Sequence, residues 1–237
     1  MSDALLVAED VSAGYHGHPI VHDLTLTVPA GKVVVLLGPN GAGKTTTLLT
    51  LSGDIPALKG EIFIDGKPTK SPLYARAKRG LSFVTEERSV FMRLSVAENL
   101  RVGRGDTDRA LDLFPELKPL LRRRAGLLSG GEQQMLSLAR ALSRTPKILL
   151  VDELSLGLAP LVVIRLLDAV QRAAHDHGVG VLLVEQHVNQ ALRVADEVLV
   201  MQRGAIVLEG ATDEVRSRLV DLEAAYLSAG PSSAEPE

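Results

Sequence analysis

The sequence contains no cysteine among its 237 residues, which excludes disulfide bonds, thiol catalysis and cysteine-ligated zinc. It also lacks a strong excess of charge of either sign. The net charge of −3 implies no strong attraction to nucleic acid or anionic lipid. No apolar run approaches the ~20 residues of a membrane-spanning helix. The length allows one large domain, or one core with an inserted subdomain.

The first ten residues have neither a basic segment nor a long apolar segment, so they do not resemble a secretory signal peptide. The simplest expectation is a cytoplasmic protein. If the protein works at a membrane, another chain must supply the membrane spans.

One glycine-rich segment organises the chain. Residues 38–46 read GPNGAGKTT and fit GxxxxGK[ST], the pattern of a phosphate-binding P-loop. An apolar, β-branched run (32–37) precedes the loop and a helix-like run (45–51) follows it, which is the context that this motif requires. A chance glycine-rich turn would not explain that context.

The loop predicts a nucleotide site. Its glycines let backbone N–H groups face a polyanion, and the helix N-terminus adds partial positive charge. Lys44 can reach the β- and γ-phosphates, and Thr45 can offer its hydroxyl to Mg²⁺. We therefore expect the nucleotide to bind at Gly38, Pro39, Asn40, Gly41, Ala42, Gly43, Lys44, Thr45 and Thr46.

A second apolar run ends in two acids, Asp152 and Glu153. Acids at the carboxyl end of a parallel strand face the ligand crevice. Asp152 can hold the hydration shell of Mg²⁺, and Glu153 can orient or deprotonate a water that attacks the γ-phosphate. The alternative is a strand that merely ends in surface charges.

Residues 128–134 read LSGGEQQ and predict a second anion site at a helix start. An ordinary capped helix would explain Ser129 and Glu132. It would not explain the paired glycines, Gly130 and Gly131, between them.

Strands alternate with helices around the P-loop, which predicts an α/β fold: a three-layer core with a mainly parallel sheet. Alternating apolar residues in segments such as 23–28 and 61–66 indicate an antiparallel β-subdomain. We expect residues 1–86 and 145–227 to form the core with this β-subdomain. Residues 87–144 would be an inserted α-helical subdomain, and residues 228–237 a disordered tail.

Taken together, these motifs resemble the nucleotide-binding subunits of ABC transporters over nearly the whole chain. LSGGEQQ is similar to the signature motif of that family, and residues 38–46 and 148–153 are similar to its Walker A and Walker B motifs. The resemblance implies that Tyr15 stacks on adenine and that His187 contacts the γ-phosphate. Without it, His187 would be interpreted as a structural histidine and Tyr15 as a surface aromatic.

The resemblance also implies a mechanism. ATP with Mg²⁺ would lie between the P-loop of one subunit and Ser129, Gly130 and Gly131 of a second ATPase, in a head-to-tail dimer of this chain with itself or with a homologue. Closure and hydrolysis would drive transmembrane permease subunits at the cytoplasmic face of the membrane. A substrate-binding protein outside the cytoplasm would be an indirect partner, and no nucleic acid is expected.

Three positions depart from the common pattern of the family. Glu86 stands at the Q-loop position, where glutamine is usual, and would join Thr45 and Asp152 around Mg²⁺. Leu154 replaces a proline. Residues 155–160 stand where the family has its D-loop, and Ala159 replaces the aspartate of that loop.

Glu86 together with the GLAP sequence at 157–160 resembles the smaller, LivF-type ATPase of branched-chain (hydrophobic) amino acid importers. Thr85 and Glu87 fit this type less well, and urea and amide importers share the GLAP feature. The sequence thus predicts an ATPase of an ABC importer, with branched-chain amino acids as the expected cargo. The alternatives are an ABC transporter with another cargo and a non-transport ABC ATPase.

Overall fold

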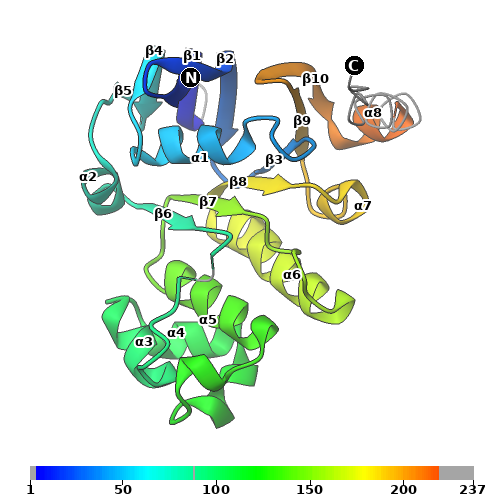
Figure 1. The fold of residues 1–237 in the computed structure, drawn as a ribbon. Helices are drawn as coiled ribbons and strands as arrows, with labels where there is room; N and C mark the ends of the chain where they lie inside the picture. Colours follow the sequence, from blue (N-terminus) through cyan, green and yellow to red (C-terminus); the bar gives the residue numbers. More distant parts are fainter. Residues whose placement is uncertain (1–3, 88, 219–237) are drawn as a thin grey trace, which may run out of the picture.

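The computed structural model describes residues 4–87 and 89–218, which form two sheets and a group of helices (Figure 1). The strands are β1 (Ala4–Tyr15), β2 (His18–Pro29), β3 (Val33–Leu37), β4 (Ala57–Ile64), β5 (Lys67–Pro68), β6 (Leu81–Val84), β7 (Ile148–Asp152), β8 (Gly180–Glu185), β9 (Glu197–Gln202) and β10 (Ala205–Ala211). The α-helices are α1 (Lys44–Ser52), α2 (Leu73–Lys78), α3 (Val96–Val102), α4 (Thr107–Leu113), α5 (Gly130–Leu142), α6 (Pro160–His177), α7 (Val188–Ala191) and α8 (Thr212–Ser217). Two 3₁₀ helices, η1 (Pro115–Leu120) and η2 (Ala125–Leu127), complete the described elements.

The larger sheet has the order β10-β9-β3-β8-β7-β6, and only its β9–β10 pair is antiparallel. Its central strand β3 is buried on both faces. Val33, Val35 and Leu37 join the core that contains α5 and α6, whereas Val34 and Leu36 join the core that contains α1 and the smaller sheet. Burial on both faces explains why this strand is a continuous apolar run and does not alternate.

The smaller sheet is antiparallel and has the order β2-β1-β4-β5. Figure 1 shows it on the α1 side of the parallel sheet, with α6 on the opposite side. The prediction of a mainly parallel core with an antiparallel β-subdomain is therefore confirmed.

The helices α3, α4 and α5 lie between β6 and β7 in the sequence and form a separate group in Figure 1. Capping boxes begin two of these helices: Ser95 and Glu98 cap α3, and Ser129 and Glu132 cap α5. A capping box satisfies backbone N–H groups that a helix start leaves unpaired. The inserted helical subdomain is thus present, while its exact limits, 87 and 144, stay a prediction.

The fold differs from the expected elements at a few places. Helices α2 and α7 were not predicted, because segments of six and four residues carry little periodicity. The last described helix, α8, begins at Thr212 and ends at Ser217. Residues 219–227 and the predicted tail, 228–237, lie outside the described residues.

The carboxyl ends of the parallel strands position the site. β3 leads into the P-loop, β7 into Glu153, β6 into Thr85 and Glu86, and β8 into Gln186 and His187. Because parallel neighbours end at the same edge of a sheet, these segments gather there.

Phe114 provides a test of the helical packing, because its side chain is fully buried and Arg165 of α6 lies over its ring. We expect Phe114→Ala to lower the free energy of unfolding by roughly 3–5 kcal/mol, the usual cost of deleting a buried aromatic. Tyr74→Ala is the matched control, since Tyr74 is 69% exposed. Denaturant unfolding measures both, and equal stability of the two variants would contradict this packing.

Candidate nucleotide site

A cavity of about 450 Å³ lies at the carboxyl edge of the parallel sheet. It joins the P-loop to acids that follow two other strands. Its lining comprises Ile20, Asn40, Gly41, Gly43, Lys44, Thr45, Thr46, Glu86, Glu153 and Leu156. The cavity therefore brings the phosphate-binding groups together with two distant carboxylates: Glu86 lies 42 positions and Glu153 lies 109 positions beyond Lys44 in the sequence.

Two glycines of the loop are required by geometry. A Cβ on Gly38 would lie 2.5 Å from the carbonyl oxygen of Met201, a distance that side-chain carbons do not tolerate. Gly43 has φ of 108°, a left-handed backbone that other residues rarely adopt. These positions let the loop turn tightly into α1, so that the N–H groups at its start remain available to an anion.

Lys44 is buried at the base of the loop. Its Nζ donates to the carbonyl oxygens of Gly38 (2.9 Å) and Pro39 (3.2 Å). The same amine lies 3.5 Å from Oε1 of Glu153. The ammonium group is thus held next to the phosphate-binding loop and the acid that is the expected base.

The carboxylate of Asp152 lies in an unfavourable environment for a charged group. Its side chain is buried, and its Oδ1 has no hydrogen-bond partner among residues 4–87 and 89–218. Burial raises the pKa of Asp152 to about 6, and the charges of Glu153 and Glu86 also raise it; the Thr45 hydroxyl and Lys44 act in the opposite direction. A cation at this position would remove much of that cost.

These residues fit Mg²⁺. The described part of the chain contains no cluster of three or more histidine or acidic side chains arranged as a metal cage. Mg²⁺ does not need one, because it usually binds through one or two carboxylates together with substrate phosphates and water. Asp152 and the exposed Thr45 hydroxyl beside it could provide the protein side of such a site.

Glu153 has a strained backbone, with φ of 42°. Positive φ is uncommon outside glycine, and in folded proteins such residues cluster at functional sites. The Glu153 N–H donates to the carbonyl oxygen of Val184 (3.0 Å), which ties the end of β7 to β8. The strain is therefore located at the residue whose carboxylate meets Lys44.

Not all the expected residues line this cavity. Tyr15 is 42% exposed at the end of β1, and it is Ile20, on β2, that lines the cavity. His187 is exposed and precedes α7. Ser129, Gly130 and Gly131 begin α5 and do not line the cavity either.

A second cavity, of about 670 Å³, adjoins the first and shares Glu86, Glu153 and Leu156 with it. Gln133 and Gln134 of α5 line it, as do the D-loop residues Gly157 and Leu158. The glutamines are part of the LSGGEQQ motif, so this cavity links the signature helix to the expected catalytic acid. Nothing in the sequence distinguishes Ile20 or Leu156 as site residues, because singly exposed apolar side chains are common on protein surfaces.

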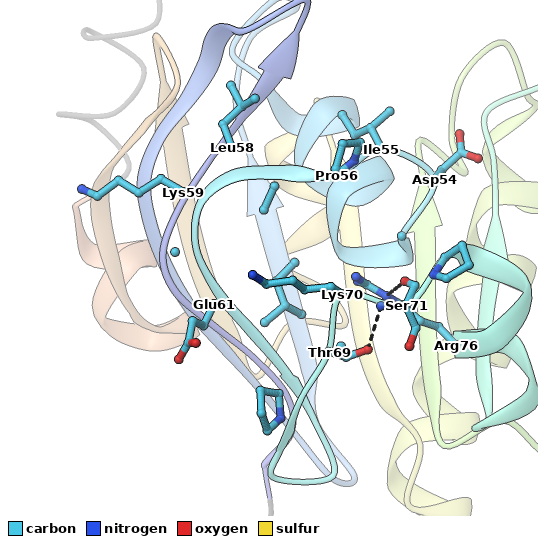
Figure 2. Close-up of a pocket in the computed structure, with 16 residues that line it drawn as sticks. Asp54, Ile55, Pro56, Leu58, Lys59, Glu61, Thr69, Lys70, Ser71 and Arg76 are labelled. Carbon is cyan, nitrogen blue, oxygen red and sulfur yellow. Dashed lines mark hydrogen bonds between the residues drawn. The ribbon is translucent and has the colours of Figure 1, made fainter.

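A third cavity, of about 540 Å³, lies away from these motifs, between the end of α1, β4 and residues 68–72 (Figure 2). Its buried Arg76 is already engaged: Nε donates to Ser71, and Nη1 donates to the carbonyl oxygens of Thr50 and Leu51. Through Nη1 the arginine therefore caps the end of α1.

Comparison with known proteins agrees with the geometry. Residues 21–155, more than half of the chain, match the ABC transporter family. The chain belongs to the ABC transporter family. The ATP-binding subunits of this family are ATP-hydrolysing subunits of transporters, so the expected ATPase activity is confirmed.

Several relatives are similar over most of their length. BraG of Pseudomonas aeruginosa, named as a branched-chain amino acid transport ATP-binding protein, is 42% identical over 86% of this chain and 91% of its own. LptB of Escherichia coli, named for lipopolysaccharide export, is 37% identical over 90% of this chain and 92% of its own. LivF of Archaeoglobus fulgidus, named for branched-chain amino acid transport, is 33% identical over 86% and 91%. The resemblance to LivF-type ATPases is confirmed.

Solved structures share the fold. A nucleotide-free ATP-binding cassette of an ABC transporter has a TM-score of 0.85 at 23% identity, and covers 96% of this chain and 100% of its own. A cassette in its ADP conformation has a TM-score of 0.85 at 24% identity, and covers 96% of this chain and 99% of its own. The P-loop NTPase fold of the ABC ATPases is thus confirmed.

Within residues 4–87 and 89–218, no helix is both long and apolar enough to span a bilayer.

The raised pKa of Asp152 predicts a pH-dependent stability. Between about pH 4 and pH 6 the unfolded chain loses this proton while the folded chain keeps it, so stability falls as the pH rises through this range. The variant Asp152→Asn removes the free-energy cost of burying an ionised carboxylate. Without divalent cations or nucleotide, we expect the variant to be more stable than wild type at pH 7, by up to roughly 3 kcal/mol, and equally stable near pH 4.

Denaturant unfolding at several pH values measures this difference. Asp168→Asn, which removes an exposed acid on α6, is the control for a simple change of net charge. A variant Asp152→Asn that is no more stable than wild type at pH 7 would contradict the buried, unsatisfied carboxylate.

Proposed function

We propose that this chain is the ATP-hydrolysing subunit of an ABC importer for branched-chain amino acids. The observation that carries the proposal is the cavity in which Lys44 and Thr45 of the P-loop meet Glu86 and Glu153. The cargo follows from relatives, because BraG and LivF are both named for branched-chain amino acid transport.

The proposed roles divide between binding and chemistry. The backbone N–H groups of residues 38–46 and the Lys44 ammonium group bind the phosphates of ATP. Thr45, Asp152 and Glu86 hold Mg²⁺, which would neutralise phosphate charge during the reaction. Glu153 orients the attacking water and accepts its proton, and His187 contacts the γ-phosphate.

The 3.5 Å contact between Lys44 and Glu153 supports this division. A bound γ-phosphate would compete with Glu153 for the lysine, since it carries more negative charge. Its arrival would release the carboxylate to engage water. Substrate binding and activation of the base are thereby linked through one amine.

We further propose that the site is completed by a second ATPase. Ser129, Gly130 and Gly131 begin a capped helix outside the Lys44 cavity, which suits groups that serve a nucleotide on another subunit. The partner would be a second copy or a homologue, joined head to tail. Tyr15, 42% exposed at the end of β1, would stack on the adenine.

The working assembly would include transmembrane permease subunits, with this chain bound at the cytoplasmic face of the membrane. A substrate-binding protein on the other side would deliver the cargo. A competing cargo is suggested by LptB, which is named for lipopolysaccharide export and is 37% identical to this chain. Transport assays, unlike ATPase assays, separate the two cargoes.

Glu153→Gln tests both the chemistry and the cargo. In the assembled transporter, we expect the variant to bind ATP with an affinity within about twofold of wild type, because binding rests on the P-loop. Turnover should fall at least roughly 100-fold, the usual range for loss of a general base. Glu61→Gln, an exposed acid on β4, is the control and should keep wild-type turnover.

In cells that lack the gene, uptake of labelled leucine should fall. It should return with the wild-type gene and remain low with Glu153→Gln. Wild-type turnover by Glu153→Gln would remove Glu153 from the mechanism. Leucine uptake that is unchanged by loss of the gene would contradict the cargo and leave the ATPase assignment in place.

A further inference from the structure

The buried carboxylate of Glu185 has no role in the mechanism described so far. Glu185 is the last residue of β8 and is 1% exposed. Burying a carboxylate among apolar side chains costs free energy unless hydrogen bonds offset that cost. Its neighbours on the strand, Leu183 and Val184, are apolar and fully buried, so packing alone would not require an acid here.

Both oxygens of this carboxylate accept hydrogen bonds from the same residue, Ser155. The backbone N–H of Ser155 donates to Oε1 (3.1 Å), and the Ser155 hydroxyl donates to Oε2 (2.8 Å). Hydrogen bonds to an ionised acceptor are stronger than neutral ones. Ser155 opens the D-loop, two residues after Glu153, so the pair joins the loop that follows β7 to the end of β8.

The segment 153–155 is held at each of its three residues. The Glu153 N–H donates to Val184, and Leu154 is fully buried in the core. The contact of Ser155 with Glu185 provides the third restraint. A strained backbone persists only where its surroundings hold it in place, and Glu153 has φ of 42°.

We propose that Glu185 is a positioning residue for ATP hydrolysis: through Ser155 it sets the direction of the Glu153 carboxylate. The same strand end leads into His187 two residues later, so Glu185 also fixes the expected catalytic acid and the expected γ-phosphate contact relative to each other. This inference rests on the proposed role of Glu153. It concerns chemistry and not nucleotide binding, because neither Glu185 nor Ser155 lines the Lys44 cavity.

The test is the separation of kcat from ATP affinity in the assembled transporter. Glu185→Ala should lower kcat at least about tenfold, because small misplacements of a reacting group are costly. The affinity for ATP should stay within about twofold of wild type. Glu185→Gln should recover most of the lost kcat, since its amide can accept from the Ser155 N–H and donate to the hydroxyl oxygen.

Ser155→Ala is the matched variant, because it removes only the bond of the hydroxyl to Oε2. Its loss of kcat should be smaller than that of Glu185→Ala. Glu185→Ala should lower kcat by a smaller factor in the Ser155→Ala background than in wild type, because the two residues are expected to act through the same contact. If Glu185→Ala does not fold, Ser155→Ala alone decides, through a lowered kcat at unchanged ATP affinity.

Wild-type kcat in Glu185→Ala, or in Ser155→Ala where the first variant does not fold, would overturn the inference. A loss of affinity as large as the loss of kcat would overturn it too, since that pattern indicates a general structural role. Glu153→Gln, measured in parallel, keeps the two proposals apart. If it loses turnover while Glu185→Ala does not, only the positioning role fails.

Discussion

The ammonium group of Lys44 lies between the carbonyl oxygens of its own loop and the carboxylate of Glu153, at the edge where the parallel strands end. Around it are Glu86 and the buried Asp152, whose pKa is raised to about 6. Carboxylates in such surroundings repel one another, and a single lysine does not balance them. The chain therefore folds around a site whose charges are best satisfied when a cation and an anionic ligand are both bound.

The rest of the architecture keeps these groups in place. β3 is buried on both faces, so the P-loop leaves a strand that is packed between two cores. β7 and β8 are joined beyond their last ladder pair by the Glu153–Val184 hydrogen bond and by the contact of Ser155 with Glu185. Apolar packing thus provides the stability, and a few buried polar contacts determine where the reactive groups point.

Much of this could be predicted from the sequence, because the responsible patterns are local. Continuous apolar runs indicated the buried strands β3 and β7, and the spacing of Ser129 and Glu132 indicated the capped start of α5. The P-loop and the two acids at the end of β7 follow from motifs with a fixed spacing. Their meeting in one cavity follows from the rule that parallel strands end at one edge.

Other features depend on tertiary contacts between distant segments and could not be predicted. The pairing of Ser155 with Glu185 joins residues 30 positions apart, and nothing in either local pattern indicates it. The participation of Ile20 in the site requires β2 to pass beside the P-loop. The places of Tyr15, His187 and Ser129 relative to a nucleotide were implied by resemblance, and a single chain does not test them.

A structure of the assembled Glu153→Gln variant with Mg²⁺ and ATP tests the central claim most directly. The account predicts that the γ-phosphate accepts a hydrogen bond from Lys44, which leaves the carbonyl oxygens of Gly38 and Pro39. Mg²⁺ should lie between the phosphates and the Thr45 hydroxyl, on the side of Asp152. A nucleotide bound elsewhere, for example in the cavity of Figure 2, or a lysine that still contacts its own loop beside bound ATP, would contradict it.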